Sequence, residues 1–181
     1  MKGRTEEGKK SKQTEAFLKA RSGWNAVINA DAAIREATAL AEEMSKENIL
    51  ASQAKGNEAL AFLEEAQQDF SQAEAAYPSL DLAAFKAYVA KRIESQQAAL
   101  AADEAYLSRN KEELEAQNSR YNALEEEAAA LAQKLGEDDP EQIVALRFYE
   151  EIEADQGAYE AERLKAGNAD AFLREYLGTA S

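Results

Sequence analysis

The chain has 181 residues, of which 45% are hydrophobic, so one domain or two small ones can form, although much of the hydrophobic fraction is alanine. Histidine and cysteine are absent, which excludes histidine general bases, catalytic triads that contain histidine, zinc sites that need either residue, and disulfides. The net charge of −14 disfavours direct contact with nucleic acid and with an anionic membrane surface, because their phosphates would be repelled.

Long helices are the only regular structure that the sequence predicts. The chain has 8 glycines and 2 prolines, so turns are few. Valine occurs only at Val27, Val89 and Val144, and no stretch alternates apolar and polar residues as a half-buried strand does. We therefore expect an all-α fold: an elongated antiparallel helical bundle of about 4–6 long helices, with an alanine-rich core and no sheet.

The N-terminal part of the chain divides into a tail and a helical segment. Residues 1–13 carry five basic and two acidic residues and almost nothing apolar, which predicts a disordered basic tail. A single elongated domain is expected over residues 14–181. Its first part, 14–78, has apolar residues at helical spacings and is predicted to form one helix or a hairpin. We favour one break, near 45–48 or 55–57, over a continuous or kinked helix.

A clear amphipathic helix is predicted over residues 57–77, and Pro78 ends it. The spacing of Ala66, Phe70, Ala73 and Pro78 resembles the second helix of a tetratricopeptide repeat, in which small residues and an aromatic allow close helix packing. The preceding stretch departs from that family's pattern, and no second copy follows at a period of about 34 residues. The resemblance therefore implies close packing of this helix and no membership of the family.

Residues 79–167 are predicted to form three length-matched antiparallel helices. Ser79 or Asp81 is expected to cap the first of them. The polar run 108–110 predicts a turn or kink, after which Asn110 would cap the second helix, at about 111–135.

The last predicted elements begin after Gly136, which suits the end of a helix. Asp139 and Pro140 are a favourable start for the third of the matched helices, which would run to about residue 167. Residues 168–181 are expected to add a short C-terminal helix and tail.

No catalytic, metal-binding or cofactor-binding residue is predicted, and we expect no enzymatic activity. Adjacent glutamates such as Glu125 and Glu126 point in different directions on a helix, so we interpret them as solvated. Large amphipathic aromatics are enriched at protein interfaces, and they also suit the boundary of a core. The candidate interface residues are Trp24, Tyr77 and Tyr176.

These features predict a non-catalytic protein-interaction or structural spacer protein with an unidentified protein partner, or a homodimer. The alternative is an acidic inhibitor that mimics nucleic acid and binds a basic protein. Neither a signal peptide nor an apolar run long enough to span a membrane is visible. As written, the chain is expected in the cytoplasm; if its N-terminus were truncated, an anchored extracytoplasmic ectodomain would be the alternative.

Overall fold

A computed structural model describes residues 2–78 and 81–135 of the chain, and the statements below concern these residues. They form four helices: α1 (Lys2–Ala41), α2 (Lys46–Ala76), α3 (Ala83–Leu107) and α4 (Lys111–Leu135). There is no strand within these ranges, so the prediction of an all-α fold without a sheet is confirmed. The two predicted helices that fall between 79 and 135 are confirmed as α3 and α4, with 25 residues each.

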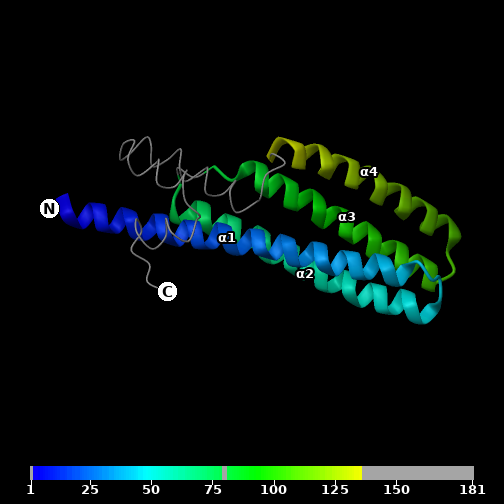
Figure 1. The fold of residues 1–181 in the computed structure, drawn as a ribbon. Helices are drawn as coiled ribbons and strands as arrows, with labels where there is room; N and C mark the ends of the chain where they lie inside the picture. The colour runs from blue at the N-terminus through cyan, green and yellow to red at the C-terminus, as the bar shows by residue number, and fades with distance from the viewer. Residues whose placement is uncertain (1, 79–80, 136–181) are drawn as a thin grey trace.

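The four helices pack side by side along one long axis (Figure 1). α1 and α2 form a long antiparallel hairpin, α3 packs against α2, and α4 packs against α3. The α1–α2 turn, residues 42–45, and the α3–α4 turn, residues 108–110, lie at the same end of the bundle (Figure 1). We call this end the turn end.

The open choice over residues 14–57 is resolved as a hairpin. α1 ends at Ala41, and Ser45 caps α2 by accepting a hydrogen bond at its Oγ from the backbone N–H of Asn48, at 3.2 Å. The break therefore falls at the first of the two predicted positions. The second predicted position, 55–57, lies inside α2. The glycine there, Gly56, is a point of close contact between helices, since an added Cβ would lie 2.8 Å from Leu100 Cδ2.

The start of α1 differs from the prediction. The structure continues the helix back to Lys2, where a disordered tail over residues 1–13 was expected. The stretch is rich in lysine, glutamate and arginine, which have high helix propensity. Adding such residues to a helix that is already nucleated costs little, and a rule based on polar composition does not include that cooperativity.

The connection between α2 and α3 follows the predicted stop at Pro78, with Tyr77 as the C-cap of α2. At the start of α3 the N-cap is Leu82, whose side chain makes no capping bond. Asp81, one of the two predicted caps, is therefore not the N-cap. Asp81 still contributes, because its Oδ1 accepts a hydrogen bond from the backbone N–H of Ala83 at 3.0 Å. Glu74 Oε1 accepts from Leu82 N–H at 3.1 Å. Ser79 lies outside the described residues.

The core is rich in alanine, as predicted, and its large residues are concentrated in the half of the bundle away from the turn end. Trp24 packs edge-on against Phe85 with ring centroids 5.4 Å apart, and Phe70 lies 5.6 Å from Phe85. Gly23 allows this close approach, because a Cβ there would lie 3.1 Å from Phe70 Cε1. Near the turn end, by contrast, the buried positions are mostly small residues such as Ala102.

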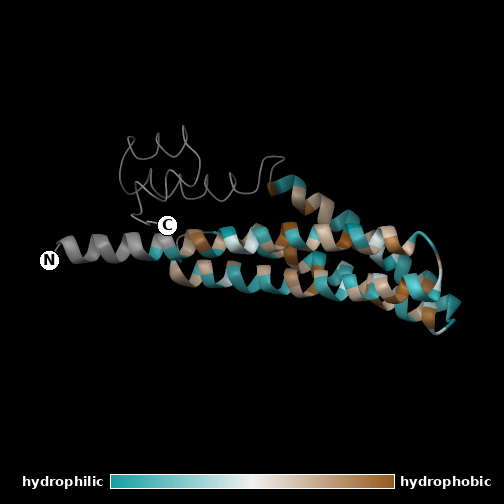
Figure 2. Ribbon diagram, turned by 60° about the horizontal axis from the view of Figure 1, so that its bottom comes forward, coloured by the Kyte–Doolittle hydropathy of each residue, from teal (hydrophilic) through white to brown (hydrophobic). Residues whose placement is uncertain are grey.

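Figure 2 shows apolar and polar residues interleaved along each helix rather than gathered in long apolar stretches. In keeping with this pattern, none of the four described helices is both long and apolar enough to cross a membrane.

Candidate interaction surface

Two of the three predicted interface residues, Trp24 and Tyr77, lie in the core rather than on the surface. Trp24 is 7% exposed and Tyr77 is 8% exposed, and both belong to the hydrophobic core cluster. A partner protein would reach neither side chain without displacing part of the bundle. Both aromatic rings therefore pack in the core, which was the alternative to an interface. The indole Nε1 of Trp24 is buried and has no hydrogen-bond partner among the described residues. Tyr176 lies outside the described residues.

A partly buried polar layer lies between α1, α3 and α4, with Arg92 of α3 at its centre. Nη2 of Arg92 donates to Asp31 Oδ1 of α1 at 2.6 Å, and Nη1 donates to the hydroxyl of Tyr88 at 2.6 Å. Ser95 Oγ donates to Glu125 Oε1 of α4. Nε of Arg92 lies 3.8 Å from the same Glu125 oxygen, an ion-pair contact that is too long for a hydrogen bond. We call these five residues the Arg92 layer.

The electrostatics of the Arg92 layer indicate a structural role. The Arg92 side chain is 11% exposed. Burial of the guanidinium lowers the pKa of Arg92, but Tyr88 and Asp31 outweigh burial and the net shift is upward. Burial raises the pKa of Tyr88, so its hydroxyl stays protonated at neutral pH. The Arg92 cation, with two carboxylates and a neutral phenol around it, links three helices.

Among the four described helices, α4 packs along α3 and makes few contacts with α1 or α2. Of its predicted apolar face, only Leu124 and Ala128 are buried. The rest of that face is half-buried, at Leu114, Tyr121, Leu131 and Leu135. A face of apolar side chains spaced three and four residues apart is therefore partly open to solvent.

A hollow of about 430 Å³ opens at the turn end. Its wall consists of side chains from the start of α2, the end of α3, the α3–α4 turn and the start of α4; the lining residues are Lys46, Ala105, Tyr106, Leu107, Arg109, Asn110, Lys111 and Leu114.

The α3–α4 turn shapes one side of the hollow. Asn110 N–H donates to Ala105 O at 2.8 Å, and Arg109 N–H donates to Tyr106 O at 3.1 Å, which together form a Schellman motif. Arg109 is the residue of this motif that adopts a left-handed conformation, with φ of 58°, a place that glycine usually occupies. Asn110 then caps α4 as predicted, because its Oδ1 accepts from the backbone N–H of Glu113 at 3.1 Å.

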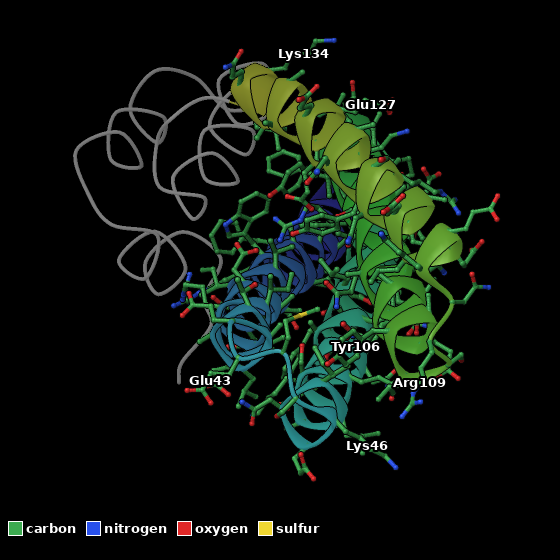
Figure 3. All side chains as sticks on the ribbon, turned by 90° about the vertical axis from the view of Figure 1, so that its right-hand side faces the viewer. Glu43, Lys46, Tyr106, Arg109, Glu127 and Lys134 are labelled. Atoms are coloured by element: carbon green, nitrogen blue, oxygen red, sulfur yellow. The ribbon has the colours of Figure 1, made fainter. Side chains whose placement is uncertain are left out.

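The two turns are tied together beside the hollow. The hydroxyl of Tyr106 in α3 donates to the backbone carbonyl of Met44 in the α1–α2 turn, at 2.8 Å. Figure 3 looks along the bundle from this end and shows Lys46 and Arg109 projecting on the same side, whereas Glu43 projects on the other. The hydrogen bond fixes the relative position of the elements that carry these cations.

Sequence reasoning identified both turns and the Asn110 cap but not the hollow or the Arg92 layer. Lys46, Arg109 and Lys111 are ordinary surface residues when they are read along the chain. The hollow could have been inferred from the predicted elements, because a hairpin break near residue 45 and two helices of equal length bring both turns to one end of the bundle.

Among the described residues, no group of three or more acidic side chains is placed to hold a metal ion. Comparison with known proteins gives no further guide, because no protein family, no curated protein and no solved structure matches this chain.

Proposed function

We propose that this chain is a non-catalytic protein-interaction or structural protein, whose helical bundle presents α4 to a helix of a partner protein. The observation that carries the proposal is the half-buried apolar face of α4, whose main neighbour among the described helices is α3. Side chains at spacings of three and four are the pattern by which one helix packs into the groove of another.

The buried part of the α4 face supports the same view. Leu124 and Ala128 are covered by the bundle, while Leu114 and Tyr121 on one side and Leu131 on the other are only half covered. A partner helix along α4 would complete the burial of these side chains and add about 25 cal/mol for each Å² of apolar surface removed from water. A second copy of the chain is one possible source of that helix.

The acidic-inhibitor alternative receives less support from the described surface. A nucleic-acid mimic needs a continuous stripe of negative charge, but cations interrupt the acidic side chains here. Lys55 pairs with Glu36 at 2.8 Å, and Lys91 pairs with Glu127 at 2.7 Å.

The test replaces Tyr121 with the photo-reactive aromatic residue p-benzoylphenylalanine in the source cell. Asn122 is exposed and adjacent, so the same replacement there is the matched control. We expect discrete protein cross-links from position 121 that are several times stronger than those from position 122. A cross-linked species at twice the mass of the chain, with light scattering to match, would identify the partner as a second copy. Equal yields from the two positions would overturn the proposal.

A further inference from the structure

The hollow at the turn end has a basic wall in a protein of net charge −14. Three cations line it, and they come from the first residue of α2, the α3–α4 turn and the first residue of α4: Lys46, Arg109 and Lys111. Among the described residues, no acidic side chain lines the wall. We infer that the hollow binds an aspartate or glutamate side chain of a partner protein, together with an apolar residue next to it.

The charges of the wall are available to a ligand. Lys46 and Arg109 are exposed and take part in no ion pair within the described part of the chain. Lys111 is 3.9 Å from Glu115, and both of those side chains are largely exposed, so the pair is weak and easily exchanged for another carboxylate.

The rest of the wall suits the neighbour of a carboxylate. Leu107 and Leu114 are half-buried, Ala105 is buried, and the ring of Tyr106 lies between them and the α1–α2 turn. An apolar side chain placed here would lose its contact with water, while an adjacent carboxylate reaches the cations at the rim. Leu114 also begins the half-buried face of α4, so the hollow and that face are continuous.

Arg109 carries particular weight because its backbone conformation is unfavourable for an arginine. A left-handed residue other than glycine is strained, and glycine would end α3 equally well. The turn nevertheless places a guanidinium at the hollow. A guanidinium can donate two parallel hydrogen bonds to one carboxylate, which an ammonium group cannot do.

The shape and the charge of the molecule favour a protein ligand over a small molecule or a nucleic acid. Small-molecule sites bury most of their ligand, whereas this hollow is open to solvent along the turn end. The overall charge of −14 opposes a polyanion more strongly than a single acidic side chain, which meets the cations of the wall at short range. The inference rests on the proposed function in one respect, namely that the ligand is a protein.

The binding test uses the blocked dipeptides acetyl-Leu-Glu-amide and acetyl-Leu-Gln-amide, which differ only in charge. Each is titrated to tens of millimolar into the full chain while backbone amide shifts are recorded by NMR. We expect the glutamate peptide to shift the amides of Lys46, Arg109 and Lys111 in a saturable way, at least threefold more tightly than the glutamine peptide. Raised salt should weaken that binding. Equal binding of the two peptides, or no saturable shift at these amides, would overturn the inference.

Three substitutions separate binding from folding. Arg109→Gly removes the guanidinium and relieves the left-handed strain, so the variant should be at least as stable as the wild type while its affinity for the glutamate peptide falls threefold or more. Arg109→Lys should lose part of the affinity. The third substitution, Arg120→Gln, is the control for the lost charge, because Arg120 is exposed on α4 and does not line the hollow. Glutamine is used here because glycine would destabilise the interior of α4. If Arg120→Gln weakened binding as much as Arg109→Gly, the attraction would be general and the inference would fail.

Two further arms identify the source of the anion and keep this inference distinct from the proposed function. Inorganic phosphate that saturates the same amides more tightly than the glutamate peptide would assign the hollow to phosphate and overturn the choice of a carboxylate. If position 121 gave no specific cross-links but the glutamate peptide still bound, only the proposed α4 interface would be overturned. If the cross-links formed but the peptide did not bind, only the inference about the hollow would be overturned.

Discussion

Asp103 of α3 shows how a single half-buried carboxyl affects the stability of this bundle. It takes part in no hydrogen bond or ion pair within the described residues, and burial raises its pKa from 3.8 to about 6. The carboxylate form is therefore less favourable in the folded than in the unfolded chain. Between pH 4 and 6 the folded chain binds more protons, so the contribution of Asp103 to stability falls as the pH rises through this window.

We expect Asp103→Asn to stabilise the protein above pH 7 and to have little effect below pH 4. The full pKa difference corresponds to about 3 kcal/mol, and partial exposure of the carboxyl reduces the expected gain to about 1 kcal/mol. Urea unfolding at pH 4 and pH 7.5 measures it, with Glu126→Gln as the control because Glu126 is exposed. A gain of equal size at both pH values would show that the raised pKa is not the cause.

Among the four described helices, α4 has the least contact with the others, since it packs along α3 and makes few contacts with α1 or α2. Local opening of such an element requires less free energy than global unfolding. The chain has no cysteine, so single engineered thiols report opening without background. Ala128→Cys places a thiol on the buried face of α4. Val89→Cys places one in the core cluster and is the control.

We expect a thiol reagent to label Ala128→Cys at least about tenfold faster than Val89→Cys, because opening of α4 alone exposes it. Adding Glu125→Gln should speed labelling at position 128 by about threefold or more, since a charge-assisted contact to Ser95 and Arg92 is lost. Labelling at position 89 should change less. Equal rates at positions 89 and 128 would show that α4 opens only when the whole bundle unfolds.

The helices themselves could be predicted because their signals are local. The Asn110 cap, the stop at Pro78 and the regular apolar spacing of α4 each act within a few residues of the chain. Contacts between helices depend on positions far apart in the sequence, such as Arg92 of α3 and Asp31 of α1, and no local pattern encodes them. For the same reason the sequence does not decide whether Trp24 lies at an interface or in the core, because its spacing fits both; the structure places it in the core.

Over the whole molecule, burial is distributed unevenly along the long axis. The core cluster combines Phe17, Trp24, Phe70 and Phe85 in the half away from the turn end. Toward the turn end, the buried residues are mainly alanines, with Ser52 and Gln96 among them. A buried Phe or Leu side chain contributes about 1.5–3 kcal/mol and an alanine much less, so the stabilising free energy falls toward the end that carries the hollow.

Amide hydrogen exchange should reveal this gradient. We expect amides near Val27, Leu63 and Phe85 to exchange only through global unfolding, and amides near Ser52 and Ala102 to exchange through openings that cost about 1–2 kcal/mol less. Leu63→Ala should lower the highest protection by about 2–5 kcal/mol. It should leave the exchange near Ala102 almost unchanged until global unfolding becomes the easier route. Uniform protection along α2 and α3 would contradict the gradient; the expected pattern would place the hollow on the part of the bundle that adjusts most readily to a partner.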